Sequence, residues 1–437
     1  MSTIERGNMQ SSGWPGHLWI EGNTLVHLPY EQSRPSHMPR GPAAKSGGSF
    51  LNPAMAPART RSVMLLNDAL EFGWLVEEDE PIRILDAMCS TGVRARRWRN
   101  EIPDTHQHRL WITANDLDSG ALEWGKLSHA HHPPRISVER ELESGRFDIE
   151  LGGELQNGIH WTNLDARRIM IDSSFQWIDL DPFGSPVSFL DIAMQSLARK
   201  GVLEVTATDT AALTGSSPGP AKRRYGSSGI VDTHSHDDAV RVLLAEVARA
   251  AARNDRIIQP LLSLFDGHHV RVSVLVQRSK KGASEVHKNI GWKIRDEVNR
   301  FSDEPEGECS GPMWTGPLFD AEIAARITDK RAIELSQPNN TDEIEGWNDN
   351  DDEYSRREIT RSVRYIADCA PIVCDEHLLI ALNDIPTIFG KAGPPSVKKL
   401  ISGLQDMGAK AARAPYLEPM IVTDASIDVV KKLLNQS

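Results

Sequence analysis

Runs of apolar residues alternate with amphipathic stretches from about Asn52 onward, and this alternation predicts a parallel sheet covered by helices on both faces. Helical spacing of apolar side chains first occurs at Val63, Leu66 and Leu70. Shorter apolar runs of strand length follow, each ending near an acidic or small polar residue. Five parallel strands are predicted in this way, at Ile82 to Asp86, Leu110 to Asp116, Ile159 to Leu164, Phe175 to Asp179 and Val202 to Thr206.

A hairpin completes the predicted sheet, and a helix precedes this hairpin in the chain. The run Leu261 to Phe265, an Asp-Gly turn and alternating valines from Val270 to Val276 predict two strands, the last of them antiparallel. This layout is typical of a class I methyltransferase, a Rossmann-like α/β fold with seven strands. A dinucleotide-binding dehydrogenase would carry three glycines after its first strand, where this chain has Gly92 alone. The residues that predict the helix face are Val240, Leu243, Leu244, Val247 and Ala251.

The regions outside this alternation differ in composition. Residues 1–48 are rich in Pro, Gly, Ser and His and predict an N-terminal arm with a short hairpin around Trp19 to Leu28. We interpret the polar stretch Ser279 to Gly311 as a linker and the acidic run Asp342 to Glu353 as a solvated loop. A helix capped by Ser396 is expected near the end of the chain. We therefore expect a methyltransferase domain at 49–279 and a smaller α+β C-terminal domain at 280–437.

Charge composition limits the class of partner. The chain has 437 residues with 61 acidic and 49 basic side chains, a formal net charge of −12. A nucleic acid would therefore have to bind a local basic patch rather than the protein surface as a whole. Four basic clusters are expected to form that patch: Arg59 with Arg61, Arg94 to Arg99, Arg167 with Arg168, and Lys222 to Arg224.

Cysteine and histidine positions bear on metal binding and on location in the cell. The four cysteines include no C-x₂-C pair, and we find neither a secretory leader nor an apolar window of about 18 residues. We therefore expect a cytoplasmic protein with no membrane span. We also expect a monomer. No metal site is expected, because the histidines near prolines or in polar runs, His129, His131, His132, His234 and His236, are interpreted as solvated loop residues.

The turn after the fourth predicted strand is the candidate for chemistry, because Asp181, Pro182 and Phe183 follow the strand directly. Ligands of open α/β sheets bind at the carboxyl ends of strands. An exocyclic amine of a nucleobase is a poor nucleophile until its hydrogens are held by acceptors. The Asp181 carboxylate and the Pro182 carbonyl oxygen can provide these acceptors, and Phe183 offers a ring on which a flipped base can stack. The turn therefore predicts methylation of an amine, with these three residues as the catalytic group.

Carboxylates after the first three strands predict a nucleoside-binding site beside this turn. Asp116 is placed to accept both ribose hydroxyls, and Asp165 is suited to an adenine amino group. Asp86 and the turn at Gly92 would let the backbone approach the cofactor closely. Because acidic residues are common at helix N-termini, the prediction rests on the occurrence of one carboxylate per strand.

Five motifs span most of the chain: SFLNPAMAPAR (Ser49 to Arg59), LDAMCSTGVRARR (Leu85 to Arg97), IDLDPFGSP (Ile178 to Pro186), VTATDTAALTG (Val205 to Gly215) and GPMWTGPL (Gly311 to Leu318). Together they resemble the tRNA (guanine 26-N2)-dimethyltransferase family of archaea and eukaryotes. The resemblance implies S-adenosylmethionine as the methyl donor and tRNA as the substrate. It also implies one or two methyl transfers to the exocyclic amine of guanine 26.

The same resemblance implies that Arg59 and Arg94 are cofactor contacts, together with Asp116, Asp165 and Ala166. A guanidinium suits the methionine carboxylate of the cofactor because it can donate two parallel hydrogen bonds. Many family members carry a four-cysteine zinc module before the GPMWTGPL motif, whereas this chain has only one cysteine there, so no structural zinc is expected. Two alternatives stay open: an amine methyltransferase acting on other RNA, DNA or protein, and a non-catalytic tRNA-binding or folding protein.

Overall fold

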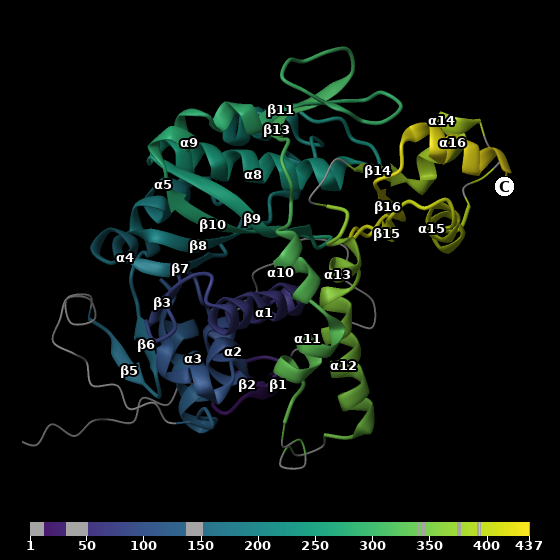
Figure 1. Cartoon of the computed structure of the whole chain (residues 1–437). Coiled ribbons are helices and arrows are strands. Elements are labelled where there is room, and N and C mark those ends of the chain that lie inside the picture. Colours follow the sequence, from purple (N-terminus) through teal and green to yellow (C-terminus); the bar gives the residue numbers. More distant parts are fainter. Residues whose placement is uncertain are drawn as a thin grey trace, which may run out of the picture.

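The computed structural model describes residues 13–31, 51–136, 152–339, 341, 344, 347–373, 377–390, 393 and 395–436. A central sheet of eight strands organises the larger part of the molecule (Figure 1). In spatial order these strands are β5 (Glu154–Gln156), β6 (Ile159–Thr162), β4 (Leu110–Asn115), β3 (Ile82–Asp86), β7 (Phe175–Leu180), β8 (Leu197–Ala207), β10 (Val270–Arg278) and β9 (Arg256–Phe265).

The strand directions confirm the predicted layout. Strands β6, β4, β3, β7 and β8 are parallel to their neighbours, whereas β10 is antiparallel to β8 and to β9. Strand β5 is an eighth strand that the sequence pattern does not reveal, because it has only three residues and pairs with β6 across a tight turn. Asn157 and Gly158 form that turn, with φ of 44° and 81°.

Helices cover both faces of the sheet. Figure 1 shows α1, α2 and α3 on one side and α4, α5 and α8 on the other. The apolar stripe predicted around Val240 to Ala251 belongs to α8 and is fully buried, as expected for a helix packed on β9 and β10. The bounds of these helices are α1 (Ala56–Phe72), α2 (Val93–Glu101), α3 (Ser119–His131), α4 (Ala166–Asp172), α5 (Val187–Ser196) and α8 (Ser235–Arg253). Short helices α6 (Thr210–Leu213) and α7 (Pro218–Pro220) and a π-helical turn (Ala221–Tyr225) connect β8 to α8.

The hairpin predicted near the N-terminus is confirmed as β1 (His17–Glu21) and β2 (Thr24–Leu28). It packs on α2 and α3 and buries Trp19, Val26 and Leu28. Most of the rest of the predicted arm at 1–48 lies outside the described residues, and the domain boundaries stay predictions. The hairpin is thus a packed part of the larger unit.

The stretch interpreted as a linker, Ser279 to Gly311, is instead folded, so that interpretation was wrong. It contains a three-stranded sheet that packs on the outer face of α8. The stretch is polar in sequence, yet its charged residue Lys293 is buried in the folded protein. The Lys293 Nζ lies 2.8 Å from Asp237 and 3.0 Å from Asp238. The elements are α9 (Lys280–Ser284), β11 (Ile290–Ile294), β12 (Phe301–Ser302) and β13 (Cys309–Trp314).

The C-terminal part begins with helices that pack along α1. The run read as a solvated acidic loop, Asp342 to Glu353, lies partly outside the described residues, and its last five residues begin α12, whose N-cap is Asn348. Acidic side chains in a first helical turn are stabilised by the helix dipole, which explains their concentration there. These helices are α10 (Ala321–Arg326), α11 (Asp329–Ser336) and α12 (Asp349–Val363), and α13 (Ile366–Cys369) packs on α10.

A small α+β unit with its own apolar core follows, as predicted (Figure 1, yellow). The helix predicted after Ser396 is confirmed, and the Ser396 hydroxyl accepts a hydrogen bond from the Lys399 N–H. None of the helices in the described ranges has the length and the apolar character that a membrane span requires. The elements are β14 (Leu378–Ala381), α14 (Ile385–Phe389), α15 (Val397–Asp406), β15 (Ala411–Arg413), β16 (Met420–Thr423) and α16 (Ile427–Gln436).

Candidate active site

A cavity of about 610 Å³ opens at the carboxyl ends of the central parallel strands. Its size is in the range of small-molecule sites in proteins. The structure brings all eight predicted site residues to the wall of this one cavity. They are Arg59, Arg94, Asp116, Asp165, Ala166, Asp181, Pro182 and Phe183.

Asn115 at the end of β4 holds the neighbouring strand ends in register. Its amide nitrogen donates to the carbonyl oxygens of Ala87 and Leu164, each at 3.0 Å. Its amide oxygen accepts from the Thr162 hydroxyl at 3.0 Å. Three loops that line the cavity are therefore fixed by one buried side chain, which the sequence analysis did not single out.

The two carboxylates predicted to bind a nucleoside are oriented by backbone N–H groups. Asp116 accepts from the N–H of Ser90 at 2.6 Å and from that of Asp118 at 2.8 Å. Asp165 caps α4 and also pairs with the Arg167 guanidinium at 2.5 Å. The hydrogen bond from Arg167 lowers the pKa of Asp165 to about 2, so this carboxylate is ionised at neutral pH.

Arg94 links the cofactor side of the cavity to the Asp-Pro-Phe turn. Its Nη2 donates to the Asp181 carboxylate at 3.0 Å, and its Nε lies 3.3 Å from Asp179 Oδ1. Its third nitrogen, Nη1, is buried and has no hydrogen-bond partner among the described residues. A buried N–H without an acceptor is costly, so the cavity wall here is suited to an anionic group.

A buried charge network lies beneath Arg94. Arg271 donates to Asp179 and lies 3.1 Å from the Glu204 carboxylate. Asp86 is paired in register with Asp179 on the adjacent strand. Burial, reinforced by the negative charge of Asp179, raises the pKa of Asp86 to about 8, so its carboxyl is largely protonated at neutral pH.

The Asp-Pro-Phe turn is held by Thr208 of the VTATDTAALTG motif. The Gly184 N–H donates to the Thr208 hydroxyl at 2.7 Å, and the Thr208 N–H donates back to the Gly184 carbonyl at 2.9 Å. Gly184 has φ of 82°, which favours glycine at this position. Phe183 is 63% exposed at the cavity mouth, where a planar ligand could stack on it.

Arg59 reaches the cavity wall from α1 and is held by the N-terminal hairpin. Its Nε and Nη2 donate to the two oxygens of Glu21, each at 2.5 Å, and Nη2 also donates to the Asn52 carbonyl at 2.9 Å. Burial alone would raise the pKa of Glu21, but the charges of Arg59 and Arg97 outweigh it and lower this pKa. The sequence analysis missed Glu21 because the hairpin was assigned to an arm.

Most of the arginines expected to form an RNA-binding patch are buried, so that prediction was wrong for them. Arg61 donates to Asp266 and to the Ser362 carbonyl, and Arg96 donates to backbone carbonyls that include that of Leu25. Charged residues are seldom buried unless paired, and no sequence pattern marked these as paired. The buried set is Arg59, Arg61, Arg94, Arg96, Arg97 and Arg99.

The histidines also differ from expectation. His129 and His234 are buried rather than solvated. His268 and His269, in the turn between β9 and β10, line the cavity, although the sequence analysis used this turn only to predict a hairpin.

The strand order, the antiparallel closing strand and the position of the cavity place this protein among the class I methyltransferases. Residues 37–435 match the family described as N2,N2-dimethylguanosine tRNA methyltransferase, and the chain belongs to that family.

Named relatives cover most of the chain. It is 28% identical over 407 residues to the tRNA (guanine(26)-N(2))-dimethyltransferase of Pyrococcus furiosus, covering 89% of this chain and 93% of the relative. It is 38% identical over 313 residues to the enzyme of the same name from Thermoplasma volcanium, covering 71% and 77%. A solved structure of Trm1 from Pyrococcus horikoshii with S-adenosyl-L-methionine superposes with a TM-score of 0.72 at 26% identity, covering 95% of this chain and 99% of the other.

Proposed function

We propose that this chain transfers one or two methyl groups from S-adenosylmethionine to the exocyclic N2 of guanine 26 in tRNA. Its family, its curated relatives and the S-adenosylmethionine complex of a structural neighbour support this activity. The observation that carries the proposal is the single cavity shared by the Asp181-Pro182-Phe183 turn and the predicted nucleoside-binding carboxylates.

The cavity has the donors and acceptors that S-adenosylmethionine requires. The Nη1 of Arg94, which has no hydrogen-bond partner in the described part of the chain, suits the methionine carboxylate. The carboxylates of Asp116 and Asp165 suit the ribose hydroxyls and the adenine amine. Ala166, which follows Asp165 at the start of α4, lines the same cavity. Arg59 also lines it. When bound, the cofactor supplies an electrophilic methyl group on a sulfonium sulfur.

The turn residues prepare the amine. The Asp181 carboxylate and the Pro182 carbonyl oxygen accept hydrogen bonds from N2 of guanine, while Phe183 stacks on the flipped base. Arg94 fixes Asp181 through the bond at 3.0 Å. S-adenosylmethionine bound in the cavity would supply the methyl group to N2, and the Asp181 carboxylate would take the proton that N2 gives up.

We assign tRNA contact to the basic side chains of the predicted patch that remain exposed. Arg167 and Arg168 lie at the start of α4, which borders the cavity, and are more than half exposed. Lys222 and Arg223 are exposed on the π-helical turn that follows α7. Such groups suit phosphates of the RNA backbone. We also propose that the enzyme acts as a monomer in the cytoplasm.

The test is methyl transfer from labelled S-adenosylmethionine to an unmodified tRNA transcript and to a copy with adenine at position 26. We expect label only in the guanine transcript, and nucleoside analysis then counts the methyl groups. Asp181→Asn should lower kcat by about 100-fold or more, because one of the two acceptors for the amine loses its charge. Asp104→Asn, at an exposed aspartate outside the cavity, is the matched control.

Three other outcomes would contradict the proposal. Equal labelling of both transcripts would indicate another amine target in RNA. Labelling of DNA or protein instead would indicate another substrate class. Binding of tRNA without methylation by the intact protein would favour a non-catalytic binding or folding role.

A further inference from the structure

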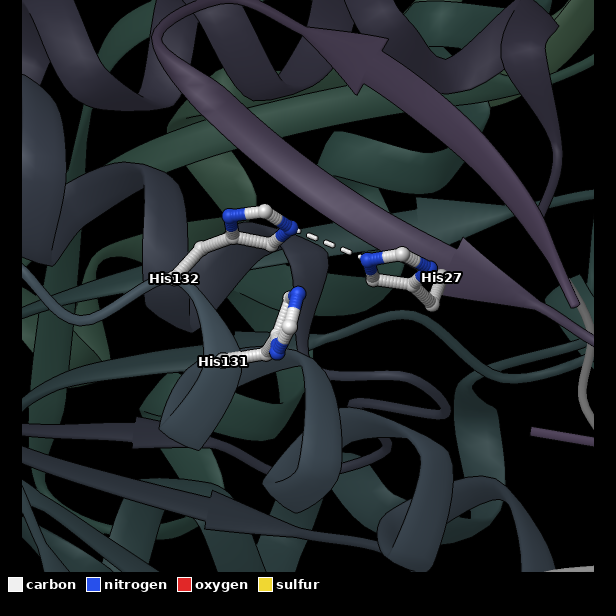
Figure 2. Close-up of side chains that lie close together, drawn as sticks. All are labelled: His27, His131 and His132. Atoms are coloured by element: carbon white, nitrogen blue, oxygen red, sulfur yellow. Dashed lines mark hydrogen bonds between the residues drawn. The ribbon is translucent and has the colours of Figure 1, made fainter. Parts of the chain in front are cut away.

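Three histidines from two separate elements meet beside the N-terminal hairpin. His27 lies on β2, His131 is the last residue of α3, and His132 follows it. One ring nitrogen from each lies within 4.8 Å of the other two. Figure 2 shows the His27 and His132 rings facing each other through their Nε2 atoms, which are 2.9 Å apart.

The hydrogen bonds of His27 determine where its lone pair points. Its Nδ1 lies 2.8 Å from the Pro15 carbonyl oxygen, which can only accept, so Nδ1 carries the proton. Its Nε2 therefore presents a lone pair toward His132. A metal-binding histidine usually donates its other ring N–H to a carbonyl or carboxylate in this way, which fixes both the tautomer and the ring orientation.

The three rings approach a common point from different directions. The His27 and His132 rings are nearly parallel, at 3°, while the His131 ring is nearly perpendicular to each, at 82° and 84°. Tetrahedral zinc with Zn–N bonds of about 2.0–2.1 Å needs ring nitrogens about 3.4 Å apart. The separation of 2.9 Å between His27 and His132 and the limit of 4.8 Å for the set bracket that value, so small ring rotations suffice.

The surroundings of His27 and His132 favour the neutral form of these two rings, as a metal requires. Burial lowers the pKa of His27. Burial, with the neighbouring His27 and Arg96, lowers the pKa of His132 to about 4. Among the described groups the Arg96 guanidinium is the nearby charge that acts on both, and it disfavours an imidazolium.

We propose that His27, His131 and His132 form a binding site for a divalent transition metal, with Zn²⁺ as the fitting ion, and that the metal ties the N-terminal hairpin to α3. His131 is exposed, which leaves a path for the ion and a position for a fourth ligand such as water. The hairpin also carries Glu21, whose carboxylate holds Arg59 at the cavity wall. The metal therefore stabilises the element that supports one side of the active-site cavity. This replaces the expectation of no metal from the sequence.

The test uses the full-length chain without a histidine tag, stripped of metal with a chelator and titrated with Zn²⁺ by calorimetry. We expect one ion per chain and a rise in Tm of about 3 °C at a 100-fold excess of free ion over the dissociation constant. Co²⁺ in place of Zn²⁺ should give the intense visible absorption of a four-coordinate site. His131→Asn should weaken binding by at least about 10-fold, because it removes one of three protein ligands.

His17→Asn is the matched control, because His17 is an exposed histidine on β1 of the same hairpin and lies outside the triad. It should bind Zn²⁺ as the unaltered chain does. His131 is exposed, so its replacement leaves the core intact and its result can be interpreted. The proposal would be overturned if the unaltered chain binds no Zn²⁺, or if His131→Asn binds Zn²⁺ as tightly as the unaltered chain. The three histidines would then form a hydrogen-bonded cluster only.

Discussion

Replacement of Glu21 by glutamine tests whether the hairpin supports the cavity through buried charge. The Glu21 carboxylate receives two hydrogen bonds from Arg59 at 2.5 Å and one from Arg97 at 3.1 Å. The side chains of Glu21 and Arg59 are 5% and 6% exposed, so solvent cannot replace the lost charge. Arg97 keeps its second partner, Glu101, at 2.6 Å, whereas Arg59 keeps only a neutral amide and the Asn52 carbonyl.

The expected loss of stability follows from this difference between the partners that Arg97 and Arg59 keep. Removing one member of a buried ion pair typically costs about 3–5 kcal/mol, because the other charge stays buried without compensation. Glutamine retains one acceptor oxygen, so we expect the lower half of this range, about 3–4 kcal/mol. With an unfolding entropy of about 2.1 cal/mol/K per residue, a 437-residue chain should lose about 3–4 °C in Tm.

Denaturant unfolding at pH 7 measures this loss, and its pH dependence checks the cause. The pKa of Glu21 is lowered in the folded state, so its stabilisation is present above its ordinary value of 4.5 and is lost as the pH falls through the folded value. The difference between the unaltered chain and Glu21→Gln should therefore shrink on acidification. Glu31→Gln, at an exposed glutamate just after the hairpin, should cost less than about 0.5 kcal/mol.

A loss for Glu21→Gln no larger than that of Glu31→Gln would refute the reasoning. It would mean that Arg59 finds another partner or water when the carboxylate charge is removed. A loss that does not vary between neutral and acidic pH would show that packing, not charge, is the cause. Calorimetric titration with S-adenosylmethionine should also show weaker binding, since Arg59 lines the cavity.

Three further substitutions test the loops around the cavity. Thr208→Val removes the acceptor of the Gly184 N–H and should lower the methyl-transfer rate about 10- to 100-fold through misplacement of the turn, as measured by single-turnover kinetics. Asp86→Asn removes a carboxyl whose folded-state pKa is raised to about 8 from 3.8. The stabilisation that the protonated carboxyl contributes is full below pH 3.8 and is lost as the pH rises toward 8, so denaturant unfolding should show stability falling less steeply with pH in the variant. Gly92→Ala places a Cβ about 2.5 Å from the Trp161 ring at φ of 68° and should cost about 2–5 kcal/mol by thermal unfolding.

Each of these three predictions has an outcome that would contradict it. An unchanged rate in Thr208→Val would mean that the turn is fixed by other contacts. Parallel pH profiles for Asp86→Asn and the unaltered chain would mean that this carboxyl ionises normally. A neutral Gly92→Ala would mean that Trp161 can move aside, which the close packing of a protein interior opposes.

Much of the fold could be predicted because strand length and apolar content are local properties of the chain. The predicted strand at Ile82 to Asp86 coincides with β3, and the predicted helix near Val240 coincides with the buried face of α8. Elements whose stability depends on distant partners were missed. The sheet around Lys293 is an example, because the polar side chain is buried only when Asp237 and Asp238 are brought to it.

The residues predicted for the site line one cavity, whereas the residues that hold them in place were not predicted. Motif residues such as Asp181 and Asp116 lie at strand ends, and parallel strands bring those ends together, so spacing alone located them. The supporting residues Glu21, Thr208 and Asn115 act through hydrogen bonds to residues that are distant in the sequence. No periodic pattern marks such contacts.

The burial of the arginines changes what the charge composition means for tRNA binding. Six arginines of the predicted patch, in a chain of net charge −12, are inside the protein, where they hold carboxylates and backbone carbonyls together. Their charge does not reach an approaching RNA as an exposed charge would. Because a nearly equal number of carboxylates is buried with the basic side chains, the exposed surface keeps the acidic balance of the composition. An acidic surface repels phosphates except where basic groups are exposed. The tRNA contacts proposed for Arg167 and Arg168 and for Lys222 and Arg223 are therefore expected to orient the tRNA as well as bind it, because these side chains are exposed.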